Sequence, residues 1–154
     1  MPGIYLGLGT NIGDREMNLI QARDLLMKHG VLVVGQSEVR ETEPLGDHPD
    51  QPMYMNQVIE VQTDLEPLEL LRACKLVEQE MGREGVVIPN LDQVGNVSFG
   101  GGGRKAPEDY TSRIIDIDLL TYNETVMNSP QLILPHPGNV ERDFVQQGIA
   151  DLEG

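Results

Sequence analysis

The sequence is poor in cysteine, aromatic and basic residues. It contains one cysteine, no tryptophan, four tyrosines and two phenylalanines among 154 residues. Cys74 alone cannot form an internal disulfide, which suits a reducing compartment. The sequence has only 11 basic residues but 25 acidic ones. The net charge of −14 argues against a nucleic-acid binder that neutralises phosphates. No run approaches about 18 consecutive apolar residues and no secretion signal is recognisable, so we expect a cytoplasmic protein without a membrane partner.

Two aspartates, Asp116 and Asp118, stand two residues apart within an otherwise apolar, β-branched run at 113–120. Successive side chains of a strand alternate between its faces, so both carboxylates point the same way. Desolvating an unpaired pair of carboxylates costs several kcal/mol, in order of magnitude, unless a cation compensates. Magnesium accepts one or two carboxylates and completes its shell with water and phosphate oxygens. The pair therefore indicates phosphoryl-type chemistry, and a solvated strand face is the alternative.

The hydrophobic pattern predicts six elements in the order β-α-β-β-α-β. The strands are expected at about 4–8, 31–42, 54–63 and 113–120, and the helices at about 14–29 and 67–81. This order matches the ferredoxin-like arrangement, an α+β fold in which both helices pack on one face of an antiparallel sheet. A long loop at about 84–109, with glycine at 100–103, separates the second helix from the last strand, and a short tail follows. We expect one domain, 1–154.

Glycines at positions 7, 9 and 13 follow the first strand and precede the first helix. This placement leaves a dinucleotide-binding domain open as an alternative, although the spacing differs by one from the usual fingerprint and the further βα units are missing. The pattern of a P-loop does not occur. A ferredoxin-like module that binds a metal or metabolite without turnover is the alternative outside the enzymes.

Several short motifs, each present once, follow one another along nearly the whole chain. They are LGTNIGD at 8–14, TxPLG at 42–46, DQPxYxN at 50–56, ExxMGR at 78–83, RxxDxD at 113–118, PHP at 135–137 and RxF at 142–144. Together they resemble the 6-hydroxymethyl-7,8-dihydropterin pyrophosphokinases of folate biosynthesis. The resemblance implies an enzyme that transfers the pyrophosphoryl group of ATP to the hydroxymethyl oxygen of the reduced pterin and releases AMP. It also implies a monomer, with a weak dimer as the alternative.

The resemblance also assigns roles to individual residues. Two Mg²⁺ ions would be held by Asp116 and Asp118, and catalysis would use Arg113, Asp116, Asp118, His136 and Arg142. ATP would be bound by Glu78 near the ribose, and by Arg83, Arg104, Lys105, Tyr110, Leu119, His136 and Arg142. The pterin would be bound by Asn56 at its edge and by Tyr54 and Phe144 against its ring, together with Thr42, Glu43, Pro44, Leu45 and Gly46. Near the C-terminus, Gln146-Gln147-Gly148 stands where the family has an apolar stretch.

Overall fold

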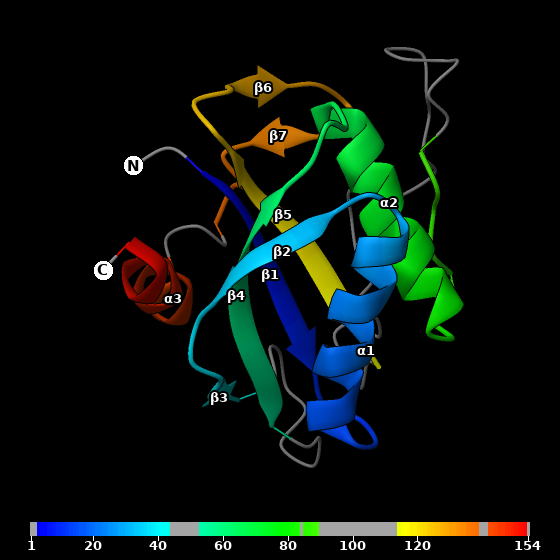
Figure 1. Cartoon of the computed structure of the whole chain (residues 1–154), viewed down its shortest axis with the longest axis vertical. Coiled ribbons are helices and arrows are strands. Elements are labelled where there is room, and N and C mark those ends of the chain that lie inside the picture. Colours follow the sequence, from blue (N-terminus) through cyan, green and yellow to red (C-terminus); the bar gives the residue numbers. More distant parts are fainter. Residues whose placement is uncertain (1–2, 44–52, 84, 90–113, 139–141, 154) are drawn as a thin grey trace.

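The computed structural model describes residues 3–43, 53–83, 85–89, 114–138 and 142–153. Its elements, shown in Figure 1, are β1 (Ile4–Thr10), α1 (Arg15–Lys28), β2 (Leu32–Gln36), β3 (Arg40–Thr42), β4 (Tyr54–Gln62), α2 (Pro67–Glu80), β5 (Asp116–Tyr122), β6 (Met127–Asn128), β7 (Ile133–Leu134) and α3 (Asp143–Glu153). In these ranges, no helix has the length and apolar character needed to cross a membrane.

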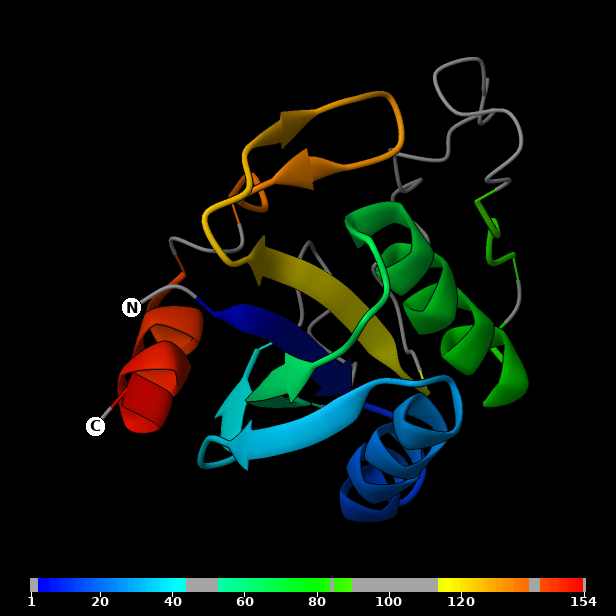
Figure 2. The same ribbon diagram turned by 45° about the horizontal axis from the view of Figure 1, so that its top comes forward.

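The main sheet is antiparallel, and its strands follow the order β2-β4-β1-β5. The short strand β3 continues the edge formed by β2 and also pairs with β4. Figures 1 and 2 show α1 and α2 on one side of this sheet and α3 on the other. The ferredoxin-like order of elements and the placement of the two long helices predicted from the sequence are thus confirmed.

Both long helices begin with side-chain caps. Asp14 precedes α1, and its carboxylate accepts a hydrogen bond of 3.2 Å from the backbone N–H of Met17. At the start of α2, Glu66 and Glu69 form a reciprocal capping box around Pro67. These bonds satisfy N–H groups that have no partner within a helix, and they fix where each helix leaves its preceding strand.

Each face of the sheet carries a hydrophobic core. The larger core lies between the sheet and α1 and α2, and includes Leu6, Leu8, Ile59, Leu70, Val77, Ile117 and Leu119. The smaller core lies under α3 and is made by Tyr5, Val58, Leu120 and Val145, with Phe144, Ile149 and Leu152 packed against it. Alternation along the strands thus supplies both cores, since Leu119 and Leu120 are neighbours in sequence but face opposite sides.

Gly148 allows α3 to approach the sheet closely. A Cβ atom at this position would lie 2.5 Å from Cγ2 and 2.8 Å from Cβ of Val58, which is fully buried in β4. Gly148 itself is buried within the helix. The residue that interrupts the apolar pattern of the C-terminal segment is therefore one at which the helix backbone packs directly against the sheet.

Two parts of the chain differ from the sequence expectation. The single strand predicted at 31–42 is divided into β2 and β3, because Ser37 pairs with Val58 twice, through its backbone N–H at 2.8 Å and through its Oγ, which accepts from the N–H of Val58 at 2.9 Å. The short tail predicted after the last strand instead contains the β6-β7 hairpin and α3.

Candidate active site

The site is built on a row of residues that crosses the sheet at the end left uncovered by α3. In the register of the strands, Gly9 of β1 lies opposite Asn56 of β4 on one side and Asp116 of β5 on the other. One step along, Gly7 lies opposite Asp118. Neighbouring strands are about 4.8 Å apart, so Asn56 and Asp116 stand roughly 10 Å apart with only glycine between them. The absence of side chains on β1 leaves room for a ligand that spans both groups.

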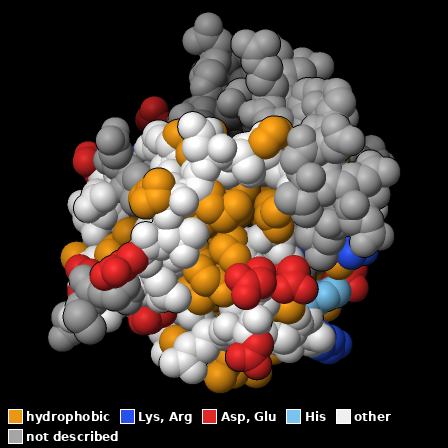
Figure 3. Space-filling model, turned by 90° about the horizontal axis from the view of Figure 1, so that it is seen from above, with side chains coloured by type: hydrophobic (Ala, Val, Ile, Leu, Met, Phe, Trp, Pro, Cys, Tyr) orange, Lys and Arg blue, Asp and Glu red, His pale blue; other side chains and the backbone are white. Residues whose placement is uncertain are grey.

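A pocket of about 480 Å³ lies over this row. The volume falls in the range of pockets that hold small molecules and cofactors. Figure 3 shows the molecule from above, at the end away from this row, where hydrophobic side chains gather at the centre and acidic side chains lie beside them. Residues that line the pocket come from many separate segments of the chain and include Gly7, Gly9, Thr42, Glu43, Tyr54, Asn56, Leu71, Lys75, Asp116, Asp118, Leu119, Leu132, His136, Arg142 and Phe144.

Asp116 is tied to α2 through a buried network of charges. The guanidinium of Arg83 contacts Asp116 at 2.9 Å and Glu78 at 2.8 Å. Glu78 is fully buried, and its carboxylate also accepts a hydrogen bond of 2.7 Å from the backbone N–H of Ile117. Because β5 lies at the edge of the sheet, this N–H would otherwise lack a partner. Glu78 therefore holds the strand at the residue between the two aspartates.

The charged groups of this network shift one another's pKa values. Burial raises the pKa of Glu78 above its ordinary value, although Lys75 and Arg83 act in the opposite direction. For Lys75, burial acts to lower the pKa, but Glu78, Asp116 and Asp118 outweigh it, and the pKa is raised. Arg83 shows the same balance between burial and its acidic neighbours. Lys75 and Arg83 are thus held in the charged form beside the two aspartates of β5.

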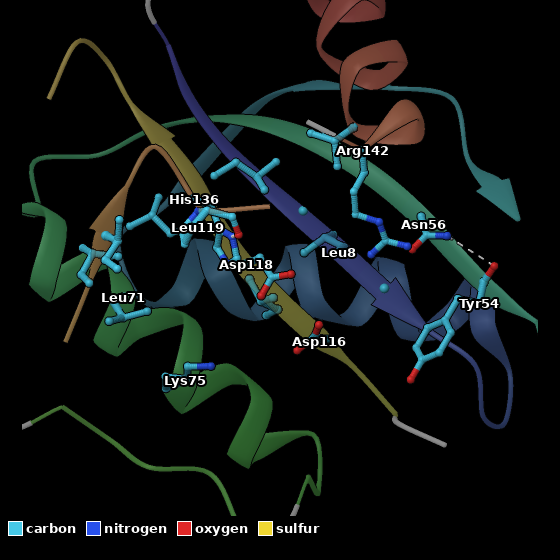
Figure 4. Close-up of a pocket in the computed structure, with 18 of the residues that line it drawn as sticks. Leu8, Tyr54, Asn56, Leu71, Lys75, Asp116, Asp118, Leu119, His136 and Arg142 are labelled. Carbon is cyan, nitrogen blue, oxygen red and sulfur yellow. Dashed lines mark hydrogen bonds between the residues drawn. The ribbon is translucent and has the colours of Figure 1, made fainter. Parts of the chain in front are cut away.

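The two aspartates point to the same side of β5, as predicted (Figure 4). Among the described residues, no group of three or more histidine, cysteine or acidic side chains forms a metal cluster. A pair of carboxylates alone suits Mg²⁺ that takes its remaining ligands from water and a phosphate chain, and does not suit a metal held entirely by protein. The donor set therefore fits magnesium bound together with a nucleotide.

On the other side of Gly9, the Asn56 side chain has a fixed orientation. Its amide nitrogen donates to Oγ1 of Thr42 at 2.7 Å and to the carbonyl of Arg40 at 3.2 Å. Its Oδ1 consequently lies over β1, where a Cβ atom on Gly9 would approach it to 3.3 Å. Figure 4 shows Tyr54 beside Asn56. An acceptor oxygen with a buried, immobile amide is suited to a ligand that presents N–H groups.

Arg142 and Phe144 enter the pocket from the start of α3. The guanidinium of Arg142 lies 4.5 Å from the centroid of the Phe144 ring, which is a cation–π contact. Figure 4 shows Arg142 reaching between Asn56 and Asp118. His136 lines the opposite part of the pocket, and its backbone N–H donates to the carbonyl of Leu120 at 2.8 Å. The two basic groups therefore reach the space above the aspartates from different elements.

The structure brings most of the described site residues predicted from the sequence into one pocket. They are Thr42, Glu43, Tyr54, Asn56, Asp116, Asp118, Leu119, His136, Arg142 and Phe144. Glu78 and Arg83 lie behind β5 in the buried network instead. The predictions for Pro44, Leu45, Gly46, Arg104, Lys105, Tyr110 and Arg113, and most of the predicted 84–109 loop, fall outside the described residues.

Sequence reasoning missed the contributions of α2 and the β6-β7 hairpin to the pocket. Leu71 and Lys75 line it from α2, and Leu132 does so from the hairpin. The spacing of Leu71 and Lys75 by four residues on a helix was a usable signal, because such residues share one face. The hairpin strands are only two residues each, too short for a periodic pattern.

Comparison with known proteins agrees with this geometry. Residues 5–154 match the model of the family described as 7,8-dihydro-6-hydroxymethylpterin-pyrophosphokinase. The chain belongs to this family. A 2-amino-4-hydroxy-6-hydroxymethyldihydropteridine pyrophosphokinase of Bacillus subtilis is 36% identical over 149 residues, which cover 96% of this chain and 76% of that protein.

Other relatives of this chain differ in length. A protein of the same name from Porphyromonas gingivalis is 33% identical over 150 residues, 97% of this chain and 89% of that one. A folate synthesis bifunctional protein of Arabidopsis thaliana is 35% identical over 151 residues, 98% of this chain. The chain spans only 27% of the length of this plant protein. The similarity therefore extends over nearly all of this chain and over one part of the longer relative.

Proposed function

We propose that this chain transfers the pyrophosphoryl group of ATP to the hydroxymethyl oxygen of 6-hydroxymethyl-7,8-dihydropterin, giving AMP and the pterin diphosphate in folate biosynthesis. The observation that carries this proposal is the row in which Asn56, Gly9 and Asp116 lie opposite one another across the sheet. An acceptor suited to a heterocycle and a carboxylate suited to a metal–phosphate complex face one pocket. Family membership supports the same reaction.

The pterin binds at the Asn56 end of the pocket. Its ring presents N–H groups, for which the fixed Oδ1 of Asn56 is an acceptor. Tyr54 and Phe144 supply aromatic surfaces for the flat ring, and both line the pocket. Thr42 and Glu43 border the same end. From the family pattern, we expect residues 44–46 to contribute further contacts to the pterin.

ATP binds at the Asp116 end. Asp116 and Asp118 would hold two Mg²⁺ ions, which when bound neutralise phosphate oxygens and orient the polyphosphate for in-line attack. Arg142 and His136 donate to phosphate oxygens from the opposite wall, and a guanidinium offers paired donors for this purpose. Leu119 lies along the nucleotide half of the pocket, although its side chain packs in the larger core. Arg83 and Glu78 orient Asp116 from behind, and Arg104, Lys105, Tyr110 and Arg113 add contacts to the nucleotide by the family pattern.

The chain's own residues act in this reaction mainly by positioning. Holding the hydroxymethyl oxygen near the β-phosphorus removes the entropic cost of bringing two substrates together. Arg142 and His136 stabilise the negative charge that moves onto phosphate oxygens as the bond to AMP breaks. The apolar walls restrict water, which would otherwise compete with the hydroxyl group as the nucleophile.

The test is to incubate purified protein with ATP, Mg²⁺ and 6-hydroxymethyl-7,8-dihydropterin and to separate the nucleotides by chromatography. We expect AMP and the pterin diphosphate in equal amounts, and neither product when the pterin or Mg²⁺ is left out. Formation of ADP in place of AMP would contradict the proposed transfer. Binding of both substrates without any product would identify a binding module instead.

A further inference from the structure

The short strand β3 forms part of the end of the pocket proposed for the pterin. It has three residues, lies at the edge of the sheet and pairs with β4. In that pairing Arg40 lies directly opposite Asn56, so both side chains project to the face that carries α3. Short edge segments open more readily than the centre of a sheet. The position of β3 therefore depends on contacts outside the sheet.

Asn56 depends on β3 for the orientation of its side chain. The two closest acceptors of its amide nitrogen are both on β3, namely Oγ1 of Thr42 at 2.7 Å and the carbonyl oxygen of Arg40 at 3.2 Å. A third acceptor, the carbonyl oxygen of Tyr54, lies 3.5 Å away within the strand of Asn56 itself (Figure 4). A displacement of β3 would therefore release the amide, and Oδ1 would no longer be held toward the pocket.

Asp151, in the last turn of α3, holds β3 from the side of the helix. Its Oδ2 lies 2.9 Å from Nη1 of Arg40 and accepts a hydrogen bond of 3.2 Å from the backbone N–H of Glu38. One carboxylate oxygen thus contacts both the strand and the segment that leads into it. The hydrogen bond from Arg40 lowers the pKa of Asp151 below its ordinary value, so the carboxylate is charged at neutral pH.

The helix does not depend on this contact for its own position. Apolar packing anchors α3, because Val145 and Leu152 belong to the smaller core and Gly148 lies against Val58 of β4. Positions 148, 151 and 152 are three and four residues apart and share one face of the helix. The core therefore fixes the helix, and Asp151 extends that fixed position to β3.

We infer that Asp151 is a positioning residue for the pterin, because it holds β3 against α3 through Arg40 and thereby keeps Oδ1 of Asn56 turned toward the ligand. This inference rests on the proposed function. Asp151 itself is not among the described residues that line the pocket, so its effect passes through β3 and the Asn56 amide. An amide already held in the binding orientation spares the ligand the cost of ordering it.

The exposure of the pair limits the size of the effect and makes it selective. The side chains of Arg40 and Asp151 are 24% and 31% exposed, and ion pairs of this kind add little to global stability. Pterin affinity falls only by the factor by which the binding orientation of Asn56 becomes less populated. A role limited to the stability of α3 would instead lower the unfolding midpoint and would weaken both substrates alike.

The experiment measures binding of 6-hydroxymethyl-7,8-dihydropterin by calorimetry, with Mg²⁺ and a non-hydrolysable ATP analogue present, in wild type, Asp151→Ala and Asp151→Asn. For Asp151→Ala we expect pterin affinity to fall about three- to fivefold and the affinity for the analogue to change less than about twofold. Asp151→Asn keeps an acceptor for both donors and should recover part of the loss. Glu38→Gln is the matched control, since it removes a negative charge that lies 3.9 Å from the same arginine on an 84% exposed side chain. It should leave pterin affinity unchanged.

A double-mutant cycle with Asn56→Ala tests the route of the effect. If Asp151 acts through the Asn56 amide, Asp151→Ala should cause no further loss of pterin affinity once this amide is absent. In steady-state kinetics, the KM for the pterin should rise in Asp151→Ala while kcat stays at the wild-type value, because only the binding of the pterin is affected.

Three results would overturn the inference. They are unchanged pterin affinity in Asp151→Ala, losses that simply add in the cycle with Asn56→Ala, and an equal loss for both substrates together with a lower unfolding midpoint. A wild-type protein that binds the pterin but forms no AMP contradicts the proposed function alone, because the binding comparison does not need turnover. A wild-type protein that binds no pterin contradicts both.

Discussion

Replacing Gly148 with alanine tests whether α3 must approach the sheet as closely as the structure indicates. The new Cβ would lie 2.5 Å from Cγ2 and 2.8 Å from Cβ of Val58, and 3.4 Å from Oγ of Ser37. Rotation of the valine side chain cannot relieve the contact with its Cβ, because this atom is fixed to the backbone of β4. Either α3 or the strand must therefore move.

Two effects of opposite sign determine the magnitude for Gly148→Ala. Alanine is favoured over glycine inside a helix by about 1 kcal/mol. Overpacking a filled core costs about 1–3 kcal/mol, and the short distances place this substitution at the upper end. We therefore expect the free energy of unfolding to fall by about 2 kcal/mol. Because Arg142 and Phe144 precede and begin α3, a displaced helix should also weaken ligand binding in the pocket.

Urea denaturation followed by circular dichroism measures this change as a lower midpoint at unchanged slope. Gln147→Ala is the control on the exposed face of the same helix, with an expected change within about 0.5 kcal/mol. A double-mutant cycle with Val58→Ala adds a sharper test, since the smaller side chain should remove part of the cost of Gly148→Ala. A Gly148→Ala protein at least as stable as wild type, or a cost unaltered in the Val58→Ala background, would refute the close-packing explanation.

Substitutions in three parts of the site test the assigned roles. Asp116→Ala or Asp118→Ala should reduce turnover by about 100-fold or more while the protein stays folded by circular dichroism; wild-type rates in either variant would exclude the metal role. Glu78→Ala should cost about 3–5 kcal/mol in urea denaturation because it leaves the Arg83 charge and a backbone N–H buried without this partner, and Glu78→Gln should cost less; equal stability of the two would be unexpected. Asn56→Ala should weaken pterin binding about tenfold in a calorimetric titration and leave ATP-analogue binding unchanged, and the reverse pattern would misplace the pterin.

The order of the main elements could be predicted because local signals mark each of them. Asp14 caps α1 and Pro67 begins α2, as their positions in the sequence indicate. The pair Asp116 and Asp118 could also be assigned to one strand face, because the period of a strand fixes relative orientation without any tertiary contact. These features depend on residues that are neighbours in sequence.

Features that depend on distant contacts could not be predicted in this way. The break after β2 arises because Ser37 bonds to both backbone groups of Val58, which lies 21 residues away: its N–H donates to the carbonyl and its Oγ accepts from the N–H. Helix α3 was not predicted because Gly148 interrupts its apolar pattern. A glycine is needed there because a Cβ atom would collide with Val58 of β4. The position of Glu78 was recognised in its motif, but its burial and its bond to Ile117 follow only from how α2 lies along β5.

The central strand shows how one alternating pattern supplies both the core and the site. In β1, Leu6 and Leu8 face α1 and α2 and are almost fully buried. The residues between and after them, Gly7 and Gly9, face the other side, where the pocket lies. Glycine weakens a strand, but β1 is paired on both sides along its length, so the sheet retains its geometry. A side chain at position 9 would contact Oδ1 of Asn56 in place of a ligand. Position 9, between the two proposed substrate positions, must therefore lack a side chain.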